Sequence, residues 1–195
     1  MKLLSWVYYL LDRRIGKKGR FNNLYLLDPD PFGCETYTYE RQKANDLIGA
    51  LHGQRFVNIL DLGCGTGVLT KELSHLSKTV TAIDFSERAI DIALRKCQAS
   101  NIKFQCNDIR NLALQERYDL IVCSEVLYYL NSQELVQFLK KIRNSQEDGT
   151  ILVTVGKVFD QTVKPLIESI FTLQHRIEKN KNRRPYAINI YRMTQ

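Results

Sequence analysis

The segment that most constrains the fold is residues 59–70, ILDLGCGTGVLT, in which three glycines occupy alternate positions between two apolar runs. Because glycine weakens both strands and helices, this spacing predicts a loop. An apolar run typical of a strand precedes the loop, and Leu69, Leu73 and Leu76 follow it at helical spacing. The segment therefore predicts a strand, a glycine loop and a helix, with bare main chain available to a ligand.

Strand and helix patterns alternate along the rest of the chain. We expect strands at residues 56–62, 79–84, 102–108, 118–125, 149–155, 174–179 and 186–192. We expect helices at residues 66–76, 86–97, 131–144 and 160–173. In the second of these, one apolar stripe is expected at Ile90, Ala93, Leu94 and Cys97, and a capping box from Asn131 to Glu134 is expected to start the third. This alternation predicts an α/β fold, a Rossmann-like doubly wound sheet of seven strands with helices on both faces. The sheet would be mostly parallel, with an antiparallel hairpin at its C-terminal edge.

The chain is basic, with 28 lysine and arginine residues against 21 aspartate and glutamate residues and a net charge of +7. Much of this charge lies in two runs, DRRIGKKGR and HRIEKNKNRR. Such runs can bind nucleic acid, but we favour a solvated face and a basic hairpin loop. Five cysteines without a Cys-x-x-Cys pair favour neither a disulfide framework nor a metal site, and they fit a reducing cytoplasm.

In a sheet of this kind, ligands bind beyond the carboxyl ends of the parallel strands. Four segments should end there and share one crevice: residues 61–67, 84–86, 107–109 and 124–129. The three histidines fall outside these segments, so we assign none of them as a ligand or a base.

The glycine loop departs from the dinucleotide fingerprint Gly-x-Gly-x-x-Gly, because Gly67 comes one residue early and Val68 stands in the last position. Asp61, directly before the loop, would repel a pyrophosphate and attract a cation. Asp84 ends the second strand, where a carboxylate can accept hydrogen bonds from both ribose hydroxyls. Asp108 could accept one from an adenine amine. The predicted ligand is nucleoside-like with a cation near the glycines, which disfavours a nicotinamide oxidoreductase.

Each of these residues also has a structural interpretation. Asp61 could cap the next helix, Asp84 could be a turn residue, and Asp108 could be a plain loop acid. Tyr128 and Tyr129 could be packing residues before the helix that follows. The sequence leaves both interpretations open at each position.

Four motifs stand in order between residues 36 and 155: LDLGCGTG, AIDFS, CNDI and YDLIVCSEVLYYL. In this order and spacing they resemble the class I S-adenosylmethionine-dependent methyltransferases. SEVLYYL, with DPDPFG and YTYERQKA upstream, is similar to a narrower group, the rhizobial nodulation-factor (NodS-like) N-methyltransferases. That group methylates an amino-sugar nitrogen on a chitin-derived oligosaccharide. Phe32 stands where the group often has tryptophan, which leaves the substrate open.

The resemblance implies S-adenosylmethionine as cofactor, S-adenosylhomocysteine as its product, and no metal. Asp61 would lie near the cofactor's ammonium, Asp84 would bind the ribose, and Phe85 would lie against the adenine. Asp108 and the Ile109 amide would contact the adenine edge. The residues that match the family's cofactor-binding positions are Tyr39, Arg41, Asp61, Gly63, Cys64, Gly65, Thr66, Gly67, Asp84, Phe85, Ser86, Asn107, Asp108, Ile109, Ser124, Glu125 and Val126.

The same resemblance places Ser124 and Glu125 near the sulfonium. Glu125 is the candidate for orienting or deprotonating the nucleophile, and Tyr129 is the candidate for shaping the methyl slot. We expect in-line methyl transfer to a nitrogen or an oxygen of a small-molecule or oligosaccharide acceptor. The alternatives are an RNA or protein methyltransferase and a non-catalytic S-adenosylmethionine-binding subunit. The oligomeric state stays open.

The length of 195 residues suits one domain. We divide it into an N-terminal helical lid at residues 1–50, a cofactor-binding core at 56–155, and a C-terminal helix and hairpin at 156–195. The opening run MKLLSWVYYLL lacks a small-residue cleavage site, so we expect an amphipathic lid helix rather than a signal peptide. The sequence contains no run of about 18 apolar residues, so we expect no membrane-spanning helix.

Overall fold

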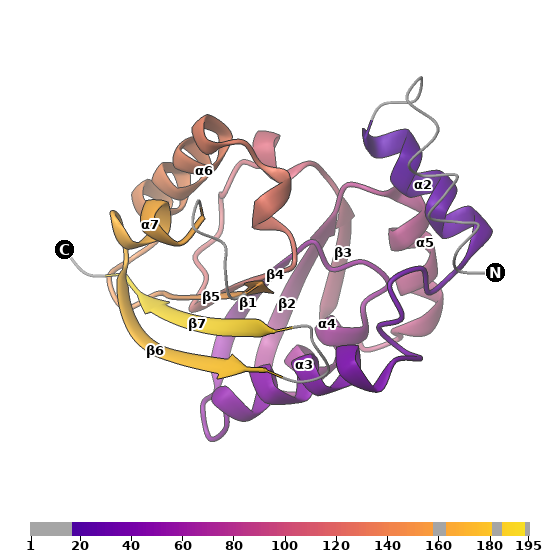
Figure 1. The fold of residues 1–195 in the computed structure, drawn as a ribbon, viewed down its shortest axis with the longest axis horizontal. Coiled ribbons are helices and arrows are strands. Elements are labelled where there is room, and N and C mark those ends of the chain that lie inside the picture. Colours follow the sequence, from indigo (N-terminus) through magenta and orange to yellow (C-terminus); the bar gives the residue numbers. More distant parts are fainter. Residues whose placement is uncertain (1–16, 158–162, 181–184, 194–195) are drawn as a thin grey trace.

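The structure, a computed structural model, describes residues 17–157, 163–180 and 185–193, and the helix expected in the opening run lies outside them. The described strands form a seven-stranded sheet in the order β3-β2-β1-β4-β5-β7-β6 (Figure 1). Their bounds are β1 Phe56–Leu62, β2 Ser77–Asp84, β3 Ile102–Cys106, β4 Leu120–Ser124, β5 Ile151–Lys157, β6 Thr172–Lys179 and β7 Tyr186–Arg192.

The sheet has the predicted mixture of strand directions. Strands β1 to β5 pair in parallel, whereas β7 pairs antiparallel with both β5 and β6. The strand order reverses at β1, which lies between β2 and β4, and ligands bind outside such a reversal point. The register aligns Leu62 with both Ile83 and Cys123, so the carboxyl ends of these three strands lie at the same level.

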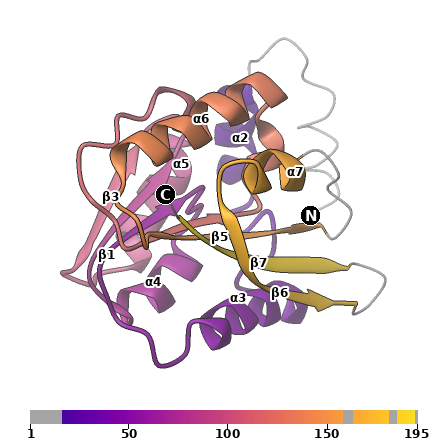
Figure 2. The same cartoon turned by 90° about the vertical axis from the view of Figure 1, so that its left-hand side faces the viewer.

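Helices cover both faces of this sheet, as predicted (Figures 1 and 2). Helices α6 and α7 pack on one face through a core that includes Phe138 and Ile167. Helices α3 and α4 pack on the other face through Leu47 and Leu73. No described helix is long and apolar enough to cross a membrane. The helix bounds are α2 Lys17–Leu27, α3 Thr38–Ala50, α4 Val68–Ser74, α5 Glu87–Lys96, α6 Ser132–Ser145 and α7 Val163–Glu168.

Several element ends differ from the sequence predictions. The third strand ends at Cys106 instead of residue 108, and the chain then enters a short 3-10 helix at Ile109–Asn111. The last helix ends at Glu168, and β6 begins at Thr172, within the range expected to be helical. Pairing of Thr172 with Arg192 extends the hairpin, so a cross-strand ladder outweighs the local helical pattern there.

Helix α5 buries two sides, where the sequence predicted one apolar stripe. Ile90 packs toward the sheet, while Ala89 and Ile92 contact Phe21 and its neighbours on α2. Leu94, which the predicted stripe included, is 55% exposed, so that part of the prediction is wrong. The physical reason is the position of α2, which draws a second side of α5 into the core (Figure 1).

The start of α6 follows its sequence signal. Asn131 accepts a hydrogen bond from the Glu134 main-chain N–H at 2.9 Å, and the Glu134 carboxylate accepts one from the Asn131 N–H at 2.9 Å. This reciprocal capping box confirms the predicted helix start.

Substitution of Asn131 by alanine removes the side-chain acceptor of this box. We expect Asn131→Ala to lower the free energy of unfolding by about 1 kcal/mol, measured by urea denaturation. Gln133→Ala, an exposed change in the same helical turn, is the control. An equal loss in both variants would show that the cap is not the cause.

Candidate functional site

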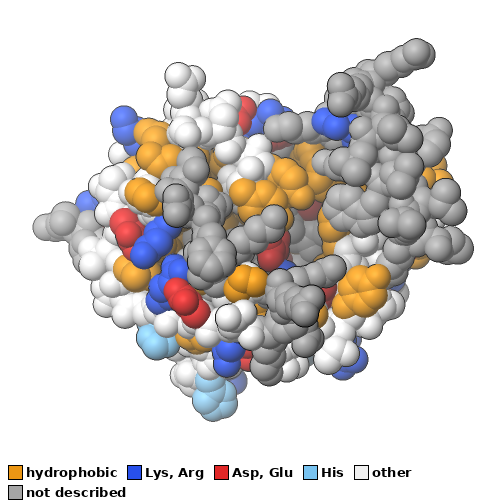
Figure 3. Space-filling view, viewed as in Figure 1, with side chains coloured by type: hydrophobic (Ala, Val, Ile, Leu, Met, Phe, Trp, Pro, Cys, Tyr) orange, Lys and Arg blue, Asp and Glu red, His pale blue; other side chains and the backbone are white. Residues whose placement is uncertain are grey.

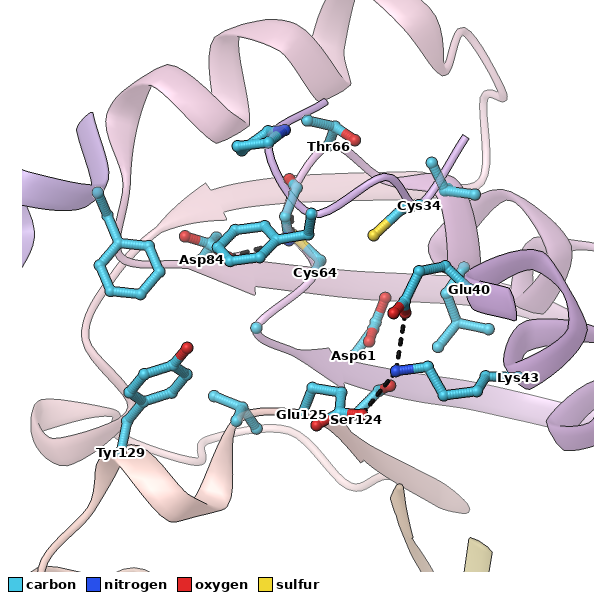
Figure 4. Close-up of a pocket in the computed structure, with 18 of the residues that line it drawn as sticks. Cys34, Glu40, Lys43, Asp61, Cys64, Thr66, Asp84, Ser124, Glu125 and Tyr129 are labelled. Atoms are coloured by element: carbon cyan, nitrogen blue, oxygen red, sulfur yellow. Dashed lines mark hydrogen bonds and ion pairs between the residues drawn. The ribbon is translucent and has the colours of Figure 1, made fainter. Parts of the chain in front are cut away.

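A cavity of about 1360 Å³ opens at the carboxyl ends of the parallel strands (Figure 4). Most of the predicted site residues line it, although they come from distant parts of the chain. They are Tyr39, Asp61, Gly63, Cys64, Gly65, Thr66, Asp84, Phe85, Asn107, Asp108, Ile109, Ser124, Glu125, Val126 and Tyr129. On the face shown in Figure 3, acidic and hydrophobic side chains lie side by side near the middle.

The glycine loop uses main-chain conformations that other residues rarely adopt. Gly63 has φ of 74° and Gly67 has φ of 82°. A Cβ atom on Gly63 would lie 2.9 Å from the Val126 side chain, so the cavity wall leaves no room for one. A Cβ on Gly67 would lie 3.1 Å from the Cys97 sulfur. This glycine therefore packs against residues behind the loop and does not face the cavity. The loop thus exposes bare main chain on its cavity side.

Asp61 is 1% exposed at the end of β1. Its Oδ2 accepts a hydrogen bond of 2.7 Å from the Thr70 hydroxyl of α4. Burial raises the pKa of Asp61 to about 6, the Thr70 hydroxyl lowers it, and the nearby Asp84 carboxylate raises it. Gly67 is the N-cap residue of α4, and no side chain caps this helix. Asp61 therefore does not act as its cap. A buried carboxylate facing a cavity favours a cationic ligand group.

Asp84 holds the glycine loop and the next turn together. Its Oδ2 accepts a hydrogen bond of 2.9 Å from the Gly65 N–H, and its Oδ1 accepts one of 2.9 Å from the Ser86 N–H. Burial raises the pKa of Asp84, although these N–H groups oppose the shift. Asp84 is therefore a turn residue, as one interpretation of the sequence suggested, and the same carboxylate also lines the cavity. Each carboxylate oxygen has a further lone pair for a ligand hydroxyl.

Asp108 is tied to Arg110. The Arg110 Nε lies 2.9 Å from Asp108 Oδ1, and the Arg110 main-chain N–H donates to the same oxygen at 3.0 Å. Asp108 thus caps the short 3-10 helix while both side chains line the cavity. Asp108 thus has a structural role in this loop, and the contact of Asp108 with adenine stays a prediction.

Glu125 has a strained main chain and an ion-pair partner that the sequence did not suggest. Its φ of 55° is the one left-handed value at a non-glycine residue among those described. Such conformations cost about 1–3 kcal/mol and cluster at functional sites. The Glu125 Oε1 lies 2.6 Å from the Lys43 ammonium, and the same ammonium lies 2.7 Å from Glu40 Oε2 (Figure 4). The three-residue spacing of Glu40 and Lys43 on a helix was a usable sequence signal.

An aromatic cluster closes the other end of the cavity. The Phe21 ring on α2 lies 5.0 Å from Phe85 and 5.5 Å from Tyr129, in edge-on geometry with both. Tyr129 is half-buried in this cluster, whereas Tyr128 is 42% exposed. Packing is therefore part of the role of Tyr129, and its part in a methyl slot stays a prediction. The residues Phe21 and Tyr25 on α2 line the cavity without having been predicted.

Three predicted site residues do not line the cavity. Arg41 is exposed on α3, and Gly67 packs beneath the loop. Ser86 caps α5 by accepting from the Ala89 N–H at 3.2 Å, and its hydroxyl donates to Asn22 Oδ1 at 2.7 Å. Ser86 thus joins α5 to α2 behind the cavity wall.

Solved structures share this fold. The N-methyltransferase NodS from Bradyrhizobium japonicum WM9, in complex with S-adenosylhomocysteine, superposes with a TM-score of 0.82. The match covers 92% of this chain and 100% of that one at 23% identity, so it shows the fold. Magnesium protoporphyrin IX methyltransferase from Synechocystis, with bound S-adenosylmethionine, has a TM-score of 0.67 at 15% identity, covering 98% and 91%. The described chain thus has the fold of these two methyltransferase structures.

Sequence relatives give the family. The family model of nodulation protein S (NodS) matches residues 22–155, and the chain belongs to this family. Nodulation protein S from Azorhizobium caulinodans is 31% identical over 106 residues, covering 54% of this chain and 51% of that protein. Malonyl-[acyl-carrier protein] O-methyltransferase from Bacillus anthracis is 31% identical over 150 residues, covering 73% and 53%. The chain thus spans about half the length of the curated relatives it matches.

The pKa of Asp61 predicts how stability depends on pH. Its folded value of about 6 exceeds the usual 3.8, so between these values the folded protein retains a proton that the unfolded chain has released. The free energy of unfolding should therefore fall as pH rises from 4 to 6, by about 3 kcal/mol from this residue.

Asp61→Asn should remove this contribution. Urea denaturation between pH 4 and 8 should show a fall that is smaller by about 3 kcal/mol in the variant. Asp91→Asn, at an exposed site on α5, should keep the wild-type pH dependence. A wild-type pH dependence in Asp61→Asn would contradict the assignment.

Proposed function

We propose that this chain transfers the methyl group of S-adenosylmethionine to a nitrogen of an amine-bearing small molecule or saccharide, with an amino sugar as the first candidate. The observation that supports the proposal most directly is that the described cavity lining is acidic although the chain as a whole is basic. Among the residues that the structure describes, two cations, Lys43 and Arg110, line it. Six carboxylates from the same described residues line it with them, namely Asp30, Glu40, Asp61, Asp84, Asp108 and Glu125. Such a site attracts a sulfonium cofactor and an ammonium-bearing acceptor.

The residues of the cavity fit this cofactor. Bound there, S-adenosylmethionine would supply an activated methyl group on a sulfonium leaving group. Asp61 is buried and faces the cavity with a raised pKa, which suits a neighbouring ammonium. Asp84 has acceptor capacity for ribose hydroxyls, and Phe85 offers an aromatic face. The bare loop at Gly63 and Gly65 allows a close approach of the ligand to the main chain.

Glu125 acts on the acceptor in this proposal. An amine arrives mainly as its ammonium and must lose a proton before its nitrogen lone pair can attack. The Glu125 carboxylate lines the cavity next to Ser124, so it can orient the ammonium and accept that proton. The aromatic residues Phe21, Phe85 and Tyr129 limit the access of water on the opposite side.

An anionic acceptor is the main alternative within the same chemistry. The malonyl-[acyl-carrier protein] O-methyltransferases among the relatives methylate a carboxylate-bearing thioester by their name, and RNA carries phosphates. The two cations that line the cavity in the described part of the chain are already paired, Lys43 with two glutamates and Arg110 with Asp108. A carboxylate or phosphate would meet uncompensated negative charge, which disfavours these acceptors. A non-catalytic cofactor-binding subunit is the alternative outside enzymes.

The first test is cofactor binding. S-Adenosylmethionine and S-adenosylhomocysteine should bind the wild type with micromolar affinity in a calorimetric titration. Asp84→Ala should weaken binding by about 10- to 100-fold, because it removes charge-assisted hydrogen bonds and loosens the loop at Gly65. Asp91→Ala, an exposed aspartate on α5, should bind as the wild type does. A folded wild type that binds neither compound would overturn the proposal.

Acceptor chemistry is tested with a matched pair. A glucosamine tetramer should accept a methyl group, whereas its N-acetylated counterpart and a malonyl thioester should not. Glu125→Gln should lower turnover of the amine about 10²-fold while leaving affinity for S-adenosylhomocysteine unchanged. Full turnover by Glu125→Gln would remove Glu125 from the reaction, and methylation of the malonyl thioester alone would favour the anionic alternative.

A further inference from the structure

The Glu125 carboxylate forms an ion pair with the ammonium of Lys43. Lys43 is 7% exposed on α3 and stands 82 residues before Glu125 in the chain. Its Nζ bridges Glu40 Oε2 at 2.7 Å and Glu125 Oε1 at 2.6 Å. The same Nζ lies 5.2 Å from the centre of the Tyr39 ring. Figure 4 shows the lysine reaching from its helix between the two carboxylates.

The other titratable groups around Glu125 are acidic or neutral. The α3 side contributes Glu40, and β1 contributes Asp61. Cys34 is a half-buried thiol near Glu40 and Lys43, with a pKa raised to about 12 mainly by desolvation, so it stays uncharged. Tyr128 and Tyr129 lie on the following 3-10 helix, and partial burial raises the pKa of Tyr128, so its hydroxyl stays uncharged. Arg110, the other cation that lines the cavity among the described residues, is paired with Asp108 and Glu134. Within the described parts of the chain, Lys43 therefore supplies the positive charge at Glu125.

Lys43 is held as a cation. Burial alone would lower the pKa of Lys43, but the carboxylates of Glu125 and Glu40 outweigh it and raise the pKa above its usual value. The single positive charge of Lys43 lies between the carboxyl groups of Glu40 and Glu125. The two acidic side chains outnumber the lysine, so this cluster can still attract the ammonium of an acceptor.

The Glu125 main chain also needs such support. A left-handed φ at a glutamate persists only where its surroundings hold it. The Glu125 N–H donates to Val155 O at 2.8 Å, which holds the main chain on β5. The Lys43 ion pair holds the side chain from α3.

We propose that Lys43 is a positioning residue that keeps the Glu125 carboxylate ionised and directed into the cavity, with Glu40 holding the lysine in place. The catalytic importance of this arrangement rests on the proposed function of Glu125. The effect of Lys43 on the ionisation of Glu125 does not rest on that function, and this effect can be measured without any acceptor.

The direct test is a ¹³C NMR titration of side-chain carboxyl groups, with the Glu125 signal identified by its loss in Glu125→Gln. In Lys43→Met the midpoint of the Glu125 titration should lie at least about one pH unit above the wild type, because an opposite charge has been removed. Lys43→Arg should restore the wild-type midpoint. Glu40→Gln removes the other partner of Lys43 but keeps its charge, so it should not raise the midpoint.

An unchanged Glu125 midpoint in Lys43→Met would overturn the proposal. If Lys43→Met fails to fold, as judged by S-adenosylhomocysteine binding and circular dichroism, the double variant Glu40→Gln/Lys43→Met replaces it. That variant has one carboxylate left instead of two, and its midpoint should still exceed that of Glu40→Gln.

Kinetics separates this inference from the proposed function. With the glucosamine tetramer, Lys43→Met should shift the acid limb of the kcat profile to higher pH, with about a tenfold loss on that limb per pH unit. Lys43→Arg should recover the profile, and Lys164→Met, which removes an ion pair on α7, should match the wild type. An inactive wild type would contradict the proposed function alone. An active wild type with an unshifted Lys43→Met profile would contradict the role of Lys43.

Discussion

The site depends on the parallel pairing of β1 with two neighbours at once. Because β1 lies between β2 and β4, with Leu62 level with Ile83 and Cys123, the carboxyl ends of the three strands lie at one edge of the sheet. Each end carries acidic residues, at Asp61, Asp84 and Glu125. Parallel strands need crossover connections, so the sheet brings together residues that are far apart in the chain. The concentration of negative charge is a direct consequence of this topology.

Negative charge in a partly dry cavity is unfavourable by itself, and the structure compensates it locally. Main-chain N–H groups from Gly65 and Ser86 stabilise Asp84, and the Thr70 hydroxyl stabilises Asp61. The compensation at Asp61 is incomplete, since burial still raises its pKa. A basic protein thus contains an acidic cavity, and the electrostatic preference of the site is opposite to that of the whole chain. This contrast is why the net charge of the chain did not predict the charge of the described cavity lining.

The N-terminal helices complete the cavity with contacts of two kinds. Helix α2 contributes apolar contacts through Phe21, and a polar one in which Asn22 accepts from Ser86. Helix α3 contributes charge through Lys43, which joins it to the end of β4. The α3 helix is also anchored to the hairpin, where the Tyr186 hydroxyl donates to Asp46 at 2.6 Å. The lid role expected for residues 1–50 therefore stays a proposal, supported by the walls that α2 and α3 form around the cavity.

The sequence by itself determined the features that depend on neighbours in the chain. Apolar periodicity located the strands and most helices, the capping signal located the start of α6, and the glycine spacing located the loop. Topology rules then placed the strand ends in one crevice, because parallel sheets allow few arrangements. Arg41 shows the limit of this reasoning: it lies two residues from Tyr39, yet on a helix that spacing turns it away from the cavity.

Only the tertiary structure decided which distant side chains meet. The pair of Lys43 and Glu125 joins elements 82 residues apart, and no local pattern encodes such a contact. The exposure of Leu94 and the burial of Phe21 likewise depend on where α2 packs. Local propensity reflects energies within a few residues, whereas these contacts are set by how whole elements share buried surface and charge. The electrostatics of Glu125 therefore belongs to the assembled fold.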